Sequence, residues 1–149
     1  MSERLYKYTE ITDLKDMLKK SGEEFGDNIA YKIRKDKDEY ETFTHKEVRE
    51  MIDALGTALI DMGLKGKRIA VIGENRYEWE IAYLAIVCGV GIVVPLDKSL
   101  PENELNHLIA RSEVEAIFYS NKYEEKLEKI KYKGVRKIKA FDINGFNRT

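Results

Sequence analysis

The sequence predicts a three-layer α/β protein, with a mainly parallel sheet between two layers of helices and a β-hairpin at the amino-terminal end. Two observations between Arg68 and Ser120 support this prediction. Short, continuously apolar runs alternate there with segments that have helical spacing and helix-start residues. Strands that are apolar throughout are buried on both faces, and strands joined through helices run parallel. Sheets of this kind bind ligands at the carboxyl ends of their strands.

Length and composition are typical of one folded domain, and we expect a single domain over residues 1–149. Hydrophobic residues make up 43% of the chain and charged residues 36%, which argues against disorder. The 26 basic and 27 acidic residues nearly cancel, so no overall field attracts nucleic acid or an anionic membrane. Cys88 is the only cysteine, which excludes an internal disulfide and favours a cytoplasmic location. No apolar run has the length of an integral membrane segment.

The first elements are a helix and a hairpin. Thr12 is a candidate cap for an amphipathic helix that ends at Gly26. Residues 29–35 and 40–43 then have the composition of two short strands around a charged turn. We therefore expect an amino-terminal β-hairpin ahead of the main sheet.

The three helices that follow each begin with the spacing of a capping box, in which two side chains bond to each other's backbone. The pairs are Thr44 with Glu47, Asn75 with Glu78, and Ser99 with Glu102. Pro101 falls in the first turn of the third of these helices, a position that proline favours. A further helix is expected over about residues 121–130. The strands of the sheet are expected at residues 68–73, 91–96, 114–119 and 135–141.

The loop at Pro95, Leu96, Asp97 and Lys98 is the best candidate binding site. It follows a strand that we expect to be central, and open sheets place ligands at such strand ends. The other interpretation is that Asp97 and Lys98 form a solvated turn that leads into the next helix.

Other candidate residues favour structural roles. Asn75, Glu78 and Trp79 are explained by a capped helix start with an anchoring indole. His45 and His107 lack partners at ligand spacing, so we expect neither a metal site nor a catalytic histidine. We interpret Cys88 as an inert buried thiol.

The basic stretch from Lys122 to Lys139 has two interpretations. Its lysines and tyrosines could hold phosphate groups. They are also typical of a solvated helix face followed by an edge strand that lysines protect from aggregation.

Three segments, in this order and spacing, resemble the amino-terminal part of AMP-forming acyl-CoA synthetases, which are adenylate-forming ligases. The resemblance is strongest to bacterial long-chain fatty-acid CoA ligases and covers residues from about Tyr8 to Phe141. The segments are Thr42–Val48 running into Ala54–Leu64, then Lys65–Trp79, and then Ala82–Asp97.

The resemblance implies a partial large domain of such an enzyme. The full-length family members use ATP, magnesium and coenzyme A to convert a fatty acid first into an acyl-adenylate and then into a thioester. It also implies that Pro95, Asp97 and Lys98 lie on the coenzyme A side of the cleft. The family's Ser/Thr/Gly-rich phosphate loop has no counterpart in the sequence, and neither does its catalytic lysine. We therefore expect no catalytic residue here, no cofactor bound by the chain alone, and a structural role as one wall of the substrate cleft.

Two alternatives to this interpretation stay open. The chain could be a non-catalytic module that binds a small molecule at its strand ends. It could also be an assembly domain that oligomerises through an exposed sheet edge or apolar face. The tail from Asp142 to Thr149 carries no stop signal, so we expect the chain to be part of a longer protein, with the remainder of the synthetase as its partner.

Overall fold

The structure is a computed structural model that describes residues 8–132 and 134–141. The predicted tail at residues 142–149 lies outside this range. No helix within the described part of the chain is both long and apolar enough to cross a membrane. The elements, in order, are α1 (Leu14–Glu24), β1 (Ile29–Arg34), β2 (Tyr40–Thr44), α2 (His45–Asp61), β3 (Arg68–Ile72), α3 (Tyr77–Ala85), η1 (Ile86–Val90), β4 (Ile92–Pro95), α4 (Glu102–Ser112), β5 (Ala116–Ser120), η2 (Asn121–Tyr123), α5 (Glu124–Glu128) and β6 (Arg136–Phe141).

Four parallel strands form the main sheet in the order β4-β3-β5-β6. The predicted parallel sheet and the predicted antiparallel hairpin of β1 and β2 are both confirmed. In the described chain β4 pairs with β3 alone and lies at the edge of the sheet, so the prediction that it is central was wrong. The exposure of β4 agrees with this edge position, because Ile92 and Pro95 are exposed and Val93 and Val94 are only half-buried. An apolar run alone therefore does not show that a strand is buried on both faces.

Side chains from both faces of the sheet enter separate hydrophobic cores, because successive residues of a strand point to opposite faces. The first core joins β3 and β5 to α2, α3 and η1, through Leu59, Ile69, Val71, Ala82, Ile86, Ala116 and Phe118. The second joins the same strands to α4 and α5, through Ala70, Ile72, Leu105, Ile109, Ile117, Tyr119 and Leu127. These two cores are the three-layer arrangement that the sequence predicts.

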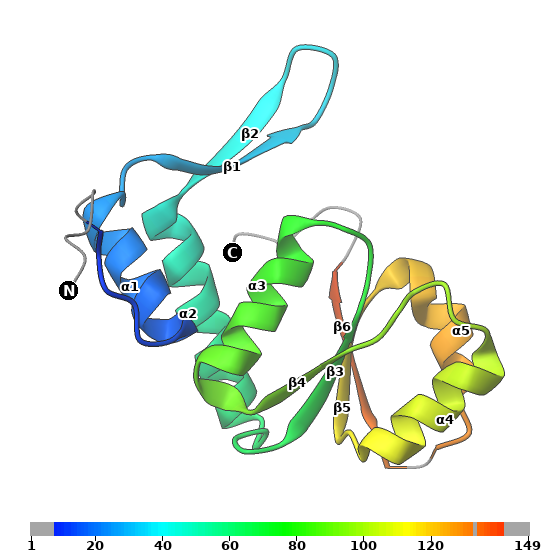
Figure 1. The fold of residues 1–149 in the computed structure, drawn as a ribbon. Coiled ribbons are helices and arrows are strands. Elements are labelled where there is room, and N and C mark those ends of the chain that lie inside the picture. The colour runs from blue at the N-terminus through cyan, green and yellow to red at the C-terminus, as the bar shows by residue number, and fades with distance from the viewer. Residues whose placement is uncertain (1–7, 133, 142–149) are drawn as a thin grey trace, which may run out of the picture.

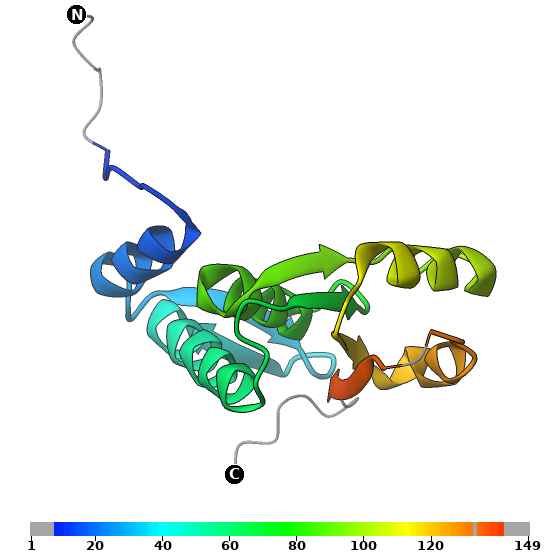
Figure 2. The same cartoon turned by 90° about the horizontal axis from the view of Figure 1, so that it is seen from below.

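The amino-terminal elements form a third core against the outer side of α3. The β1–β2 hairpin extends away from the main sheet (Figure 1), and its inward side chains meet those of α2 and α3. In both views α1 lies at the opposite end of the molecule from α4 and α5 (Figures 1 and 2). The residues of this core include Phe43, Val48, Ile52, Ile81, Leu84 and Ala85.

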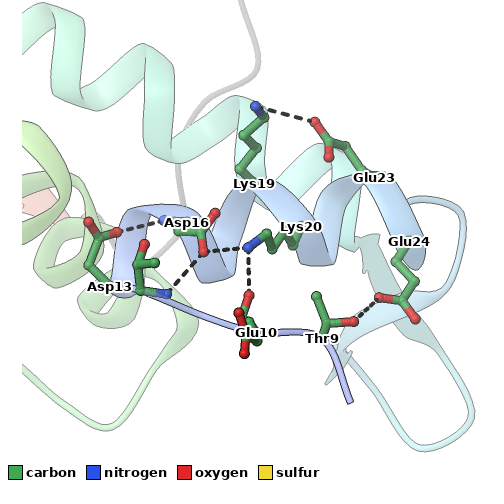
Figure 3. A network of polar contacts seen from close by, with 9 residues as sticks. Thr9, Glu10, Asp13, Asp16, Lys19, Lys20, Glu23 and Glu24 are labelled. Atoms are coloured by element: carbon green, nitrogen blue, oxygen red, sulfur yellow. Dashed lines mark hydrogen bonds and ion pairs between the residues drawn. The ribbon is translucent and has the colours of Figure 1, made fainter. Parts of the chain in front are cut away.

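A polar network holds the segment before α1 along that helix (Figure 3). Lys20 Nζ donates to the backbone oxygen of Glu10 at 2.5 Å and to Asp16 Oδ2 at 2.7 Å. Thr9 Oγ1 donates to Glu24 Oε2 at 3.1 Å. Most of these groups are exposed, so each contact contributes little stability, but together they fix the path of the chain into α1.

One predicted capping box is present. Glu47 donates its backbone N–H to Thr44 Oγ1 at 3.2 Å, and Thr44 donates its own to Glu47 Oε2 at 2.9 Å. This exchange satisfies two N–H groups that have no partner within α2.

The other predicted caps were wrong. The helix α1 is capped by Asp13, whose Oδ1 accepts from Asp16 N at 2.7 Å, and not by Thr12. Helices α3 and α4 begin after Arg76 and Pro101, neither of which makes a side-chain cap. Two of the residues expected to cap them, Glu78 and Ser99, bond to other side chains, which are described with the candidate site.

The apolar helix predicted from residue 75 onward ends in the π-helical turn η1. The chain then passes very close to the residue before β3. Gly91 N donates to Ile86 O at 2.9 Å, and Ile92 N donates to Lys67 O at 2.9 Å. A Cβ atom on Gly91 would lie 2.2 Å from that same Lys67 oxygen, so only glycine fits this crossing.

Candidate functional site

The candidate site is the edge of the sheet at which the parallel strands end. Three loops meet there: residues 73–76 after β3, residues 96–101 after β4, and η2 after β5. From β3 the chain moves to β4 on one side and then crosses to β5 on the other. In doubly wound sheets ligands bind where the order reverses in this way, which here is between β3 and β5.

A hydrogen bond joins the two loops at this point. Ser120 Oγ donates to Glu74 Oε2, and the Ser120 side chain is only 2% exposed. Burial tends to raise the pKa of Glu74. The bond from Ser120, a bond from its own backbone amide, and the charges of Lys122 and Arg76 outweigh that tendency and hold the pKa below its ordinary value. The crevice therefore contains a fixed carboxylate.

Arg76 is held in place by Glu78, which is fully buried. Arg76 Nε lies 3.1 Å from Glu78 Oε2, and its terminal nitrogen donates to Glu78 Oε1, so the pair is bidentate. The Glu78 carboxylate is thus turned toward a cation and does not cap the helix start. Trp79 is partly buried and packs against the core, and its ring stacks on that of Tyr83 with the ring centroids 5.5 Å apart. This agrees with an anchoring indole.

The loop after β4 carries the residues predicted from the sequence. Asp97 Oδ1 accepts from Ser99 N at 2.8 Å and from Ser99 Oγ at 2.7 Å, so Ser99 is not free to cap α4. The backbone bond from Ser99, followed by that from its hydroxyl, lowers the pKa of Asp97. Lys98 is exposed, and its Nζ lies 3.5 Å from Asn75 Oδ1 in the loop after β3.

Pro95 has a structural explanation at the edge of the sheet. The N–H groups of Ile92 and Leu96 donate to backbone oxygens along β3, so the nitrogen of Pro95, one residue before Leu96, faces away from β3. A proline there removes a donor that would otherwise face the free edge, a position in which edge strands tolerate proline.

The sequence did not indicate Glu74 or Ser120 as site residues, and it indicated Lys122 only as part of the basic stretch. Each follows or ends a strand next to the point where the order reverses, and that point becomes visible only when the strand order is known. The Ser120–Glu74 bond joins residues 46 positions apart.

The two histidines and the cysteine lie in helical elements away from this edge. His45 begins α2, next to Phe25, and His107 is exposed on α4. Burial raises the pKa of the Cys88 thiol, which disfavours the reactive thiolate. Among the described residues, no group of three or more His, Cys, Asp or Glu side chains is arranged to hold a metal ion.

The side chains of three lysines of the basic stretch have partners within the part of the chain that the structure describes. Lys129 pairs with Glu102 at 3.0 Å, and Lys139 pairs with Glu124 at 2.6 Å. Lys126 donates to backbone oxygens of the loop after β4. The strand β6 forms an edge of the described sheet and carries the charged residues there, which agrees with a protected edge strand.

Curated relatives of the chain include fatty-acid and other CoA ligases. It is 33% identical to long chain acyl-CoA synthetase 1 of Arabidopsis thaliana over 115 residues, which are 74% of the chain and 17% of that protein. It is 25% identical to long-chain-fatty-acid–CoA ligase 1 of Homo sapiens over 126 residues, or 83% of the chain and 18% of that protein. The chain therefore spans less than a fifth of the length of these two relatives.

Solved structures confirm the fold. NpsA of Klebsiella oxytoca in complex with 3-hydroxyanthranilyl-AMSN has a TM-score of 0.72 and 17% identity, over 88% of this chain and 25% of that one. The NpsA N-terminal subdomain in complex with 3-hydroxybenzoyl-AMSN has a TM-score of 0.68 and 18% identity, over 84% of this chain and 29% of that one.

The model of the family described as "AMP-binding enzyme" matches residues 18–147. This range contains the parallel sheet, the three loops at its edge and the segments that resemble acyl-CoA synthetases. The chain therefore belongs to the AMP-binding enzyme family.

Proposed function

We propose that the chain is the amino-terminal part of a cytoplasmic, AMP-forming fatty-acid CoA ligase of the bacterial long-chain type. The complete enzyme would use ATP and Mg²⁺ to join a fatty acid to AMP with release of pyrophosphate. It would then transfer the acyl group to the thiol of coenzyme A. The similarity to long-chain acyl-CoA ligases over most of the chain supports the reaction class. The single cysteine favours the cytoplasmic location.

Within that enzyme, the role proposed for residues 1–149 is structural: they form one domain and one wall of the cleft. The observation behind this proposal is the state of the charged groups at the strand ends. Glu74 is bonded by Ser120, which joins the ends of β3 and β5, and Arg76 is bonded by Glu78, which fixes the loop after β3 to the start of α3.

The structural role predicts that the chain alone does not turn over. The purified chain, incubated with ATP, Mg²⁺, a fatty acid and coenzyme A, should release no AMP above the level without enzyme, measured by chromatography. AMP release that scales with the amount of chain would contradict this proposal.

Two measurements distinguish the structural role from the alternatives. In calorimetric titration with coenzyme A, AMP and flavin mononucleotide, micromolar binding would favour a small-molecule binding module. A defined oligomer in light scattering would favour an assembly domain.

The coenzyme A side of the cleft is proposed to include Pro95, Asp97 and Lys98. Lys98 is the group best able to meet a phosphate, because its ammonium is exposed and lies 3.5 Å from an uncharged amide oxygen, that of Asn75. In the full-length enzyme, Lys98→Glu should raise the apparent Michaelis constant for coenzyme A about tenfold or more, since it replaces an attraction by a repulsion. The constant for ATP should stay the same.

Lys37→Glu is the matched control, because Lys37 is exposed in the turn of the hairpin, far along the chain from the strand ends. It should leave both constants unchanged. If Lys98→Glu also leaves the constant for coenzyme A unchanged, the proposed assignment of this loop is wrong.

A further inference from the structure

The loop between β4 and α4 has a bend of its own that is bonded from within. Asp97 Oδ1 accepts from the backbone N–H and the hydroxyl of Ser99, and Leu100 N donates to Asp97 O at 3.4 Å. Such an Asp-centred turn satisfies the N–H groups of the bend. It leaves carbonyl oxygens of the same bend without a strand or helix partner.

Lys126 supplies the missing donor from another element. It lies in α5, and its Nζ donates to Lys98 O at 3.1 Å and also to Leu100 O. The two carbonyls belong to the residues on either side of Ser99, so one ammonium group links both sides of the bend. Hydrogen bonds from a charged donor are stronger than those between neutral groups, and the bond from Lys126 to Leu100 O is also partly buried.

The helix that carries Lys126 is anchored independently of this contact. Leu127 and Ile130 are buried in the core that also contains Leu96, the residue just before the bend. Lys129 pairs with Glu102 at the start of α4. The bend and α5 face each other across an open groove of about 560 Å³, which is lined by Ser99, Leu100, Pro101, Glu102, Lys122, Glu125, Lys126 and Lys129.

We infer that Lys126 is a positioning residue for the loop after β4. By binding the carbonyls of Lys98 and Leu100 it sets the backbone at Lys98, and thereby directs the Lys98 ammonium toward the loop after β3. The role of this loop in binding coenzyme A rests on the proposed function. The bracing of the loop by Lys126 does not, and it can be measured without any ligand.

Hydrogen exchange of the chain, resolved at single amides by NMR, tests the inference. In Lys126→Met, which keeps the length of the side chain and removes its charge, the amides of Ser99 and Leu100 should exchange roughly tenfold faster. Amides of the central strands β3 and β5 should exchange at the rate of the unaltered chain. Lys126→Arg, which retains a donor, should restore most of the protection at Ser99 and Leu100.

The matched control is Lys129→Met, because Lys129 lies three residues further on and pairs with carboxylates, not with the loop carbonyls. It should leave exchange at Ser99 and Leu100 unchanged. Equal exchange in the two methionine variants would overturn the inference, and so would faster exchange throughout the core in Lys126→Met, which would show a general loss of stability. Neither result depends on whether coenzyme A binds, so the inference and the proposed function fail separately.

Discussion

Alanine in place of Gly91 is expected to reduce the free energy of unfolding by about 3 kcal/mol, since over-packing of a tight contact costs this much. The added Cβ would lie 2.2 Å from Lys67 O and 3.1 Å from Lys67 N. These are backbone atoms of the residue just before β3, and Lys67 O also accepts the N–H of Ile92. The clash therefore cannot be relieved by turning a side chain, and relief must come from shifting β4 against β3. Chemical denaturation followed by circular dichroism measures the loss.

Gly56→Ala is the control, because it makes the same substitution with the opposite expected sign. Gly56 lies inside α2, and a Cβ there would meet its neighbours only at 3.8 Å, which is ordinary contact. Alanine favours a helix interior over glycine, so this variant should gain roughly 0.5–1 kcal/mol. If Gly91→Ala proves as stable as the unaltered chain, Gly91 does not pass as close to the Lys67 backbone as the structure shows.

Methionine in place of Arg76 is expected to cost about 3 kcal/mol, because it leaves the carboxylate of Glu78 buried without a cation. Glu78 is 0% exposed, and Arg76 donates to both of its carboxylate oxygens. The pKa of Glu74 should also rise, because the charge of Arg76 is one of those that hold it down. Denaturation measures the first effect, and carboxyl carbon NMR as a function of pH measures the second.

Removing both partners tests the cause of this loss. The double variant Arg76→Met with Glu78→Leu should be more stable than Arg76→Met alone, because no buried charge then lacks a partner. Lys67→Met is the matched control for an exposed pair. Lys67 and Glu115 lie 3.0 Å apart, but their side chains are 43% and 48% exposed, so its loss should stay within about 1 kcal/mol. A loss from Arg76→Met that is no larger than this would contradict the structural importance of the bond from Arg76, whose side chain is 35% exposed, to the buried carboxylate of Glu78.

The capping residues show where sequence patterns succeed and where they fail. Thr44 and Glu47 bond to each other as their spacing predicts, and the structure contains this capping box. Asn75 with Glu78 has the same spacing, but Arg76 draws the Glu78 carboxylate away, and Ser99 is likewise bonded to Asp97. Spacing shows which side chains could cap a helix. The other partners within reach decide whether they do.

The candidate site shows a similar division. The loop at Asp97 and Lys98 could be found because it follows an apolar run that ends in polar residues. Glu74 and Ser120 could not be paired in advance, because neither lies in a recognisable motif and their contact requires β3 and β5 to be neighbours. The edge position of β4, which places the reversal of strand order between β3 and β5, is likewise not encoded in its apolar run.

The sequence by itself determined the kinds of element, their order and the three-layer α/β class. These depend on the period of apolar residues and on local turn residues, which act over a few positions. Only the tertiary structure decided the strand order, the edge position of Pro95 and the bonds that link Glu74 to Ser120 and Lys126 to the loop after β4. These depend on which strands the crossing helices bring side by side, and on contacts between residues 26 to 46 positions apart.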